Sequence, residues 1–144
     1  MKDDRACFID TNILVYAFDR SEAKKNKKAR QLIGKCFKGE VLLATSTQTL
    51  SEFFVVVTKK IQKPIAGSQA SGIIRNIIDF KGFSILTIKP GTIVSAANAC
   101  NETTAHYWDC LIAETMKENS VYRIYTENAK DFGKIGGIEV INPF

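Results

Sequence analysis

Short runs of apolar residues alternate along the chain with longer segments of helical periodicity. The short runs predict buried strands, at residues 7–9, 41–44, 83–88, 121–125 and 138–141. Between them, apolar residues recur three and four positions apart, as at Ala29, Leu32, Ile33 and Cys36, which is typical of an amphipathic helix. This spacing predicts a helix that begins near Thr11 or Asn12, and further helices at 21–37, 50–61, 68–80, 92–100 and 105–117.

Strands that alternate with amphipathic helices form βαβ units, so this order predicts a mainly parallel sheet with helices on both faces. The expected fold is of the α/β class, a three-layer α/β/α sandwich around a central five-stranded sheet. No internal repeat, low-complexity tract or linker rich in Pro or Ser divides the chain, so residues 1–144 are expected to form a single domain. Sites in such folds lie at the carboxyl ends of the strands.

The composition is that of an ordinary globular protein, with 45% hydrophobic and 24% charged residues in a chain of 144. No apolar stretch is long enough to span a bilayer. Residues 1–5 run directly into the first predicted strand, without an apolar leader. We therefore expect a cytoplasmic protein that does not contact a membrane.

The cysteines and the single histidine exclude two kinds of chemistry. Cys7, Cys36, Cys100 and Cys110 include no C-x-x-C pair, so with only His106 beside them a zinc cluster is not expected. Cys7 and Cys110 lie in apolar segments and are expected to be reduced core residues. One histidine also excludes a ribonuclease mechanism in which two histidines act as acid and base.

The positive charge of the chain is concentrated in one segment. Lys and Arg number 20 against 15 Asp and Glu, giving a formal net charge of +5, which favours polyanionic partners. Between Glu22 and Glu40 there is a basic run, made up of Lys24, Lys25, Lys27, Lys28, Arg30, Lys35 and Lys38. This run is either a solvated helix face or a surface that contacts the phosphate backbone of RNA, and the pattern favours neither.

Three acids lie where a strand gives way to a helix. Asp10 ends the first predicted strand, Glu52 comes shortly after the second, and Asp109 stands among apolar residues early in a predicted helix. Each also has an ordinary explanation. Asp10 is a suitable N-cap, and the helix dipole favours Glu52 and Asp109 near the N-termini of their helices, even as exposed side chains.

Further oxygen-bearing side chains follow the fourth strand, at Thr126, Asn128 and Asp131, in a segment that also has the composition of a turn. An oxygen-only set suits a hard cation such as Mg²⁺, for which Mn²⁺ can substitute. Clustered carboxylates also ionise together cheaply only with a cation between them. Such a metal activates water and neutralises charge on phosphate, so the acids predict phosphodiester hydrolysis.

Four sequence blocks resemble the PIN domain family, and in particular the toxin nucleases of VapBC toxin–antitoxin pairs. They are FIDTNIL at 8–14, LSEF at 50–53, YWDCLIA at 107–113, and the stretch from TEN at 126–128 to the closing NPF. The resemblance implies a PIN-like α/β/α sandwich, Mg²⁺-dependent endoribonuclease activity and frequent homodimerisation. It also implies a small antitoxin partner whose tail occupies the acidic site.

By position in these blocks, Asp10, Glu52 and Asp109 match the family's metal-binding and catalytic acids, and Asn12 and Thr126 match its supporting polar residues. Many members carry an aspartate where this chain has Asn128, so Asn128 is a supporting candidate and Asp131 a substitute fourth ligand.

Two other interpretations stay open at this point. One is a PIN-type nuclease that processes RNA outside any toxin pair. The other is an RNA-binding or interaction domain with weakened catalysis, which the asparagine at position 128 makes conceivable.

Overall fold

The computed structural model describes residues 5–144, which form a five-stranded sheet. The strands are β1 (Cys7–Ile9), β2 (Leu43–Ser46), β3 (Phe83–Leu86), β4 (Arg123–Tyr125) and β5 (Glu139–Ile141). Their order is β3-β2-β1-β4-β5, and every neighbouring pair is parallel. The sheet predicted as mainly parallel is therefore wholly parallel, and the carboxyl ends of all its strands lie along one edge.

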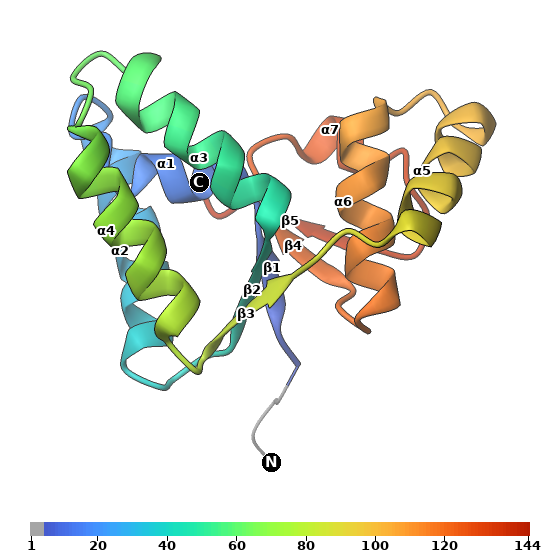
Figure 1. The fold of residues 1–144 in the computed structure, drawn as a ribbon, viewed down its shortest axis with the longest axis horizontal. Coiled ribbons are helices and arrows are strands. Elements are labelled where there is room, and N and C mark those ends of the chain that lie inside the picture. Colours follow the sequence, from blue (N-terminus) through green and yellow to red (C-terminus); the bar gives the residue numbers. More distant parts are fainter. Residues whose placement is uncertain (1–4) are drawn as a thin grey trace.

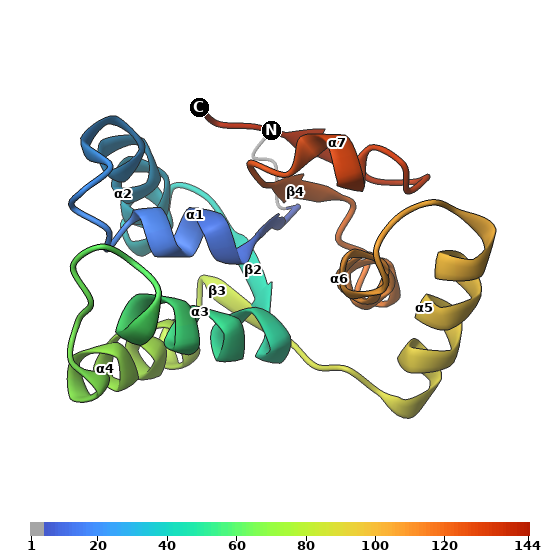
Figure 2. The same ribbon diagram turned by 90° about the horizontal axis from the view of Figure 1, so that it is seen from above.

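Helices cover both faces of this sheet, as the α/β/α prediction requires (Figure 1). One face carries α1 (Thr11–Tyr16), α2 (Ala23–Phe37), α3 (Thr47–Lys59) and α4 (Gly67–Asp79). The other carries α5 (Pro90–Glu102), α6 (Tyr107–Glu118) and the short α7 (Ala129–Phe132). Seen from above, the two groups of helices stand apart on either side of the strands (Figure 2). Within residues 5–144, no helix is long and apolar enough to cross a membrane.

Alternate side chains of β1 enter two separate cores. Cys7 and Ile9 pack with α1–α4, whereas Phe8 packs with α5–α7 on the opposite face. Successive side chains of a strand point to opposite faces, so a strand buried on both sides is apolar throughout. This explains why the run that precedes Asp10 has no polar position.

Polar residues extend β2 beyond its predicted end. The strand covers 43–46 rather than 41–44, because buried Thr45 and Ser46 pair with β3. Ser46 then caps α3, since its Oγ accepts a hydrogen bond from the backbone N–H of Thr49 at 3.1 Å. The helix therefore begins at Thr47, before the first residue of the apolar pattern.

The other differences also arise at element ends. Pro90 opens α5, since proline suits the first turn of a helix, and the helix runs past the predicted 92–100. The segment expected to be a turn after β4 contains α7, which is too short to show a periodic pattern. Gly39 ends α2 as predicted, with a φ of +77° that glycine adopts without strain.

All four cysteines are free, as expected. Cys7 and Cys110 are buried in the two cores, and Cys36 is buried as well. Burial raises the pKa of the Cys7 thiol to about 12, although the nearby Arg123 charge opposes the shift. A thiol with such a pKa stays protonated and packs as a small apolar side chain.

Candidate active site

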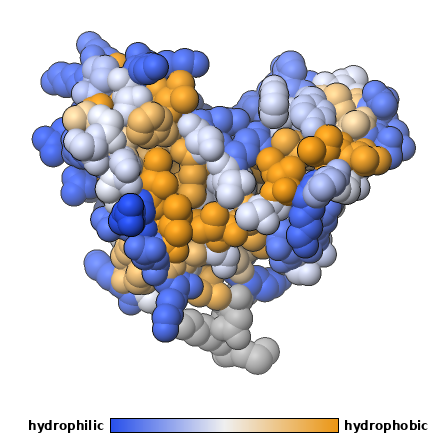
Figure 3. Space-filling view, viewed as in Figure 1, coloured by the Kyte–Doolittle hydropathy of each residue, from blue (hydrophilic) through white to orange (hydrophobic). Residues whose placement is uncertain are grey.

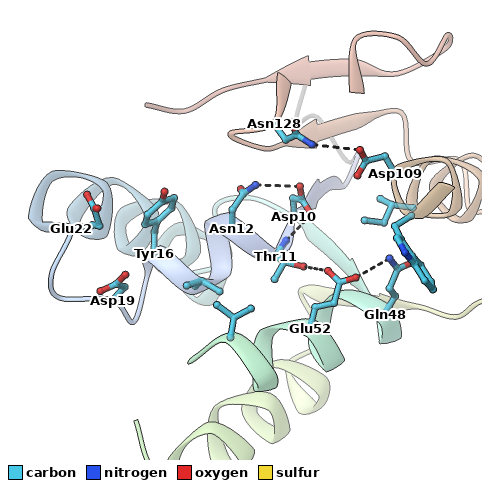
Figure 4. A pocket seen from close by; sticks show the side chains of 14 residues that line it. Asp10, Thr11, Asn12, Tyr16, Asp19, Glu22, Gln48, Glu52, Asp109 and Asn128 are labelled. Atoms are coloured by element: carbon cyan, nitrogen blue, oxygen red, sulfur yellow. Dashed lines mark hydrogen bonds between the residues drawn. The ribbon is translucent and has the colours of Figure 1, made fainter. Parts of the chain in front are cut away.

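A cavity of about 460 Å³ opens at the carboxyl edge of the sheet. Asp10, Glu52 and Asp109 all line it, although they come from three different segments of the chain (Figure 4). The remaining side chains of its wall are Thr11, Asn12, Val15, Tyr16, Asp19, Glu22, Gln48, Val56, Trp108, Ile112 and Asn128. The structure thus brings together the three acids that the sequence singled out.

Asp10 is both a helix cap and a wall residue of the cavity. Its Oδ1 accepts a hydrogen bond from the backbone N–H of Thr11 at 2.8 Å, which caps α1. Its Oδ2 accepts from the Thr126 hydroxyl at 2.8 Å and from the Asn12 amide at 3.4 Å. Burial raises the pKa of this carboxyl, although the hydrogen bonds from Thr126 and Thr11 oppose the shift. Three neighbouring groups of the chain thus hold one carboxylate in a single orientation.

Asp109 lies in the first turn of α6, on the opposite side of the cavity. The Asn128 amide donates a hydrogen bond to its Oδ2 at 3.5 Å. Burial, followed by the negative charges of Asp10, Asp131 and Glu52, raises the pKa of Asp109 to about 6, while His106 opposes the shift. Neighbouring carboxylates repel one another when they are ionised, and a bound cation relieves this repulsion.

Glu52 differs from the other two acids because it is exposed. Its Oε2 accepts a hydrogen bond from the Thr11 hydroxyl at 2.9 Å, and its Oε1 accepts from the Gln48 amide at 3.0 Å (Figure 4). Thr11 therefore links two of the acids, since its backbone N–H binds Asp10 and its hydroxyl binds Glu52.

The donor atoms of the cavity suit a hard cation. They are carboxylate, hydroxyl and amide oxygens, without a thiolate or an imidazole in the lining. The carboxylates are spread around the cavity, however. Within residues 5–144, no group of three or more His, Cys, Asp or Glu side chains is gathered closely enough to hold a metal ion as it stands. The residues thus fit Mg²⁺ by the chemistry and charge of their donor atoms.

The structure separates the two candidates for the fourth position. Asn128 lines the cavity and contacts Asp109, whereas Asp131 is outside the lining and pairs with Lys134 at 3.5 Å. Asp131 acts on the site through its charge, which contributes to the raised pKa of Asp109.

Thr126 connects the supporting residues. Its buried hydroxyl donates to Asp10 and accepts a hydrogen bond from the backbone N–H of Asn128 at 2.9 Å. The next residue, Glu127, donates its backbone N–H to the Asn12 side chain at 3.2 Å. The segment 126–128 therefore orients both Asp10 and Asp109.

An ion pair that the sequence did not indicate fastens this segment to α2. The Lys25 ammonium lies 2.7 Å from Oε2 of Glu127, and the Tyr16 hydroxyl donates to Oε1 of the same carboxylate at 3.0 Å. Lys25 also lies over the rings of Tyr16 and Phe144, at 4.9 and 5.8 Å from their centroids. Among the candidate RNA contacts of the basic run, which are Lys24, Lys25, Lys27, Lys28 and Arg30, Lys25 is thus held within the chain.

The side chains of the other candidates are exposed and have no hydrogen-bond or ion-pair partner among residues 5–144; these are Lys24, Lys27, Lys28 and Arg30.

Gln48 and Trp108 also line the cavity, and neither was predicted from the sequence. The position of Trp108 directly before Asp109 could have indicated that it lies at the site, whereas nothing in the sequence indicated Gln48.

The parallel sheet and the acidic cavity at its carboxyl edge place this protein among the α/β sandwich proteins whose site lies at the strand ends. The family is then given by its sequence: the PIN domain model matches residues 7–138, and the chain belongs to the PIN domain family. A search of the curated proteins finds no match to the chain.

Solved structures share this fold over nearly the whole chain. VapC20 of Mycobacterium tuberculosis, described as a toxin that cleaves the sarcin–ricin loop, has a TM-score of 0.70 and 16% identity, covering 94% of this chain and 98% of its own. A toxin–antitoxin complex from Klebsiella pneumoniae has a TM-score of 0.65 and 21% identity, covering 96% and 98%. VapBC2 from Rickettsia felis, bound to a promoter DNA fragment, has a TM-score of 0.66 and 19% identity, covering 95% and 98%.

Proposed function

We propose that this protein is a Mg²⁺-dependent endoribonuclease and the toxin of a toxin–antitoxin pair. The observation that carries the proposal is the meeting of Asp10, Glu52 and Asp109 on one cavity at the carboxyl edge of the sheet. Membership of the PIN domain family and the fold shared with toxin structures support it. The proposal includes that the protein acts in the cytoplasm.

Asp10, Glu52 and Asp109 would hold the metal, and Mn²⁺ would substitute for Mg²⁺. Bound there, the cation would lower the pKa of a water molecule and neutralise charge that develops on the phosphate. The chain's own contribution is to position these groups. Thr126 and Asn12 orient the carboxylate of Asp10, and the Asn128 amide orients Asp109.

Glu52 would in addition orient the water molecule that attacks the phosphate. Its carboxylate is exposed at the cavity, and hydrogen bonds from Thr11 and Gln48 hold it without burying it. Because its oxygens are exposed, they can accept a further hydrogen bond from water beside these two, whereas the carboxylate of Asp10 is only 7% exposed.

The test is cleavage of RNA by the purified protein with and without Mg²⁺. We expect cleavage with Mg²⁺, none with EDTA, and a loss of about 100-fold or more in Asp10→Asn, which removes the charge and keeps the shape. Asp79→Asn is the matched control, since Asp79 is an exposed acid at the end of α4. RNA that is bound but not cut would instead support the RNA-binding interpretation.

We also propose that two copies associate through an apolar groove on α3, α4 and β3. The groove has a volume of about 450 Å³ and is lined by Leu50, Phe54, Ile74, Ile78 and Ile85, with Thr47 and Ser51. Phe54 is 38% and Ile78 52% exposed. Figure 3 shows hydrophobic residues gathered in a band across this face, continuing between the two groups of helices. Large exposed apolar patches mark association surfaces.

Light scattering on the isolated protein tests this interface. We expect a dimer that Ile78→Glu converts to a monomer, while Arg75→Glu, an exposed position on the same helix, leaves it intact. A wild-type monomer at tens of micromolar protein would contradict the proposal.

The proposed antitoxin is a small protein whose tail enters the acidic cavity. Five acids line this cavity, namely Asp10, Asp19, Glu22, Glu52 and Asp109, which favours a tail that carries arginine or lysine. Co-expression with the product of an adjacent short gene should yield a complex in which RNA cleavage is inhibited. A nuclease without such a partner would instead belong to RNA processing.

A further inference from the structure

Trp108 exposes most of its ring at the cavity, directly beside Asp109. It is the single tryptophan of the chain, it lines the cavity, and it is 62% exposed. Tryptophan has the largest apolar surface to bury, so an indole left in solvent presents a free π face. The Tyr107 ring packs edge-on against it, with centroids 5.3 Å apart and planes at 73°, and Tyr107 itself packs against the core. The indole is therefore supported from one side and open elsewhere.

Gln48 provides a second and independent observation on the same wall. Its Nε2 donates to Oε1 of Glu52 at 3.0 Å, while its own Oε1 is buried and has no hydrogen-bond partner among residues 5–144. The reverse orientation of the amide would set its oxygen against the Glu52 carboxylate, so the free atom is the acceptor. Buried acceptors without a donor are rare, and a ligand that supplies an N–H group stabilises them.

We propose that Trp108 and Gln48 form a subsite for one nucleobase of the RNA substrate. The indole face stacks on the base, and a small turn of the Gln48 side chain brings its Oε1, shielded in the free protein, against the exocyclic amino group of the base. Uracil has no such group: its one donor on this edge, the N3–H, lies between two carbonyl oxygens that Oε1 would repel. The subsite therefore favours adenine, cytosine or guanine over uracil next to the cleaved bond.

This inference rests on the proposed ribonuclease function and extends it to base preference. A base is the expected occupant because the phosphate positioned by the acids carries one nucleoside on each side, within reach of the same cavity wall. Stacking on an aromatic side chain is also the usual way in which proteins hold an unpaired RNA base.

The fluorescence of Trp108 reports on the subsite directly, since no other tryptophan contributes. Protein in Ca²⁺, a hard cation that offsets the charge of the acids, is titrated with tetraadenylate, tetracytidylate and tetrauridylate, and with an abasic tetranucleotide of the same length and charge. We expect saturable quenching by the first two, affinity lower by severalfold for tetrauridylate, and no quenching by the abasic chain. A tetranucleotide of N6,N6-dimethyladenosine, which stacks but lacks the amino hydrogens, should behave like tetrauridylate.

Variants separate the two residues, with affinity measured by the anisotropy of labelled tetranucleotides. Trp108→Ala should weaken binding of tetraadenylate by about tenfold, and Trp108→Phe should restore most of it. Gln48→Met, which keeps the length of the side chain, should remove the preference over uracil. Tyr122→Ala is the control, since Tyr122 is an exposed aromatic residue outside the cavity lining, and it should change nothing.

Equal quenching by the abasic chain would overturn the stacking step, and equal affinity for all bases would overturn the role of Gln48. A change in Trp108 fluorescence that follows protein concentration and not nucleotide would assign the ring to a contact between copies. These readouts need no cleavage, so the base subsite and the proposed nuclease activity can fail separately.

Discussion

The cavity has two walls that are built in opposite ways. The inner wall, made up of Asp10, Asn12 and Asn128 with the buried Thr126 behind them, comes from the end of β1, from α1 and from the segment after β4, and its central carboxylate is 7% exposed. The outer wall, made up of Gln48, Glu52 and Trp108, comes from α3 and α6, and both Glu52 and Trp108 are exposed.

This difference gives the two walls different roles in the proposed site. A buried carboxylate held by several donors keeps one geometry, which suits a ligand to a cation. Exposed side chains on helix surfaces remain free to meet a large substrate. Changes to the inner wall should therefore affect metal affinity and stability, whereas changes to the outer wall should affect the binding of RNA.

The largest effect is expected from Thr126→Val, which keeps the shape of the side chain and removes its hydroxyl. Asp10 then loses a hydrogen bond of 2.8 Å and the Asn128 N–H loses its acceptor. We expect a loss of about 10–100-fold in Mg²⁺ affinity and in RNA cleavage. The free energy of unfolding should fall by about 1–3 kcal/mol. Calorimetry with Mg²⁺ and urea unfolding measure the two effects.

Thr126→Ser is the control, because it retains the hydroxyl at the same position. It should keep Mg²⁺ affinity within a few-fold of the wild type. If Thr126→Val binds Mg²⁺ as tightly as the wild type, the inner wall does not orient the metal ligands.

A change of pH should have an intermediate effect on stability and on Mg²⁺ affinity, through the carboxyl group of Asp109. Its pKa is raised from 3.8 to about 6 in the folded chain, so the metal-free protein loses the stability that this proton confers as pH rises from about 4 to about 6. Mg²⁺ binds the ionised form, so its affinity should rise by up to about tenfold per pH unit over the same range. The shift in Tm caused by Mg²⁺, measured at pH 5, 6 and 7, should increase accordingly.

Asp109→Asn should flatten this dependence, because the amide does not titrate. Burial also raises the pKa of Asp10, so the pH dependence of Mg²⁺ affinity that remains should come from Asp10. A Tm shift that is the same at all three values would show that neither carboxyl must lose a proton to bind the metal.

The smallest effects should distinguish Lys25 from its neighbours in the basic run. Lys24→Gln, Lys27→Gln and Lys28→Gln together should weaken RNA binding several-fold and reduce the salt dependence of log K by about 2, since each removes one phosphate contact. Lys25→Gln should leave that slope unchanged and lower Mg²⁺ affinity slightly, because Lys25 fastens Glu127 and the segment that carries Thr126. Filter binding at a series of salt concentrations measures the slopes.

If Lys25→Gln changes the slope as each neighbour does, the Glu127 pair opens to admit RNA. If the triple variant changes nothing, the exposed run is only a solvated face of α2.

Most of the fold could be predicted from the sequence because it depends on local periodicity. The apolar run at 7–9 and the spacing of Ala29, Ile33 and Cys36 describe a strand and a helix face that the structure contains. The missed α7 and the displaced β2 depend on capping and on buried polar residues, which leave no apolar pattern. Asp10 and Glu52 could be chosen because each follows a strand, and a parallel sheet brings its strand ends to one edge. Asp109 follows a helix and was chosen for its apolar neighbours and for the YWDCLIA block.

The sequence by itself determined the class of fold, the edge that carries the site and the three acids of the cavity. Only the tertiary structure decided that Asn128 and not Asp131 lines the cavity, that Lys25 is paired with Glu127, and that Gln48 and Trp108 share a wall. The reason is physical. Periodicity reports which face of an element is buried, whereas these contacts join segments far apart in the chain and depend on how the elements pack.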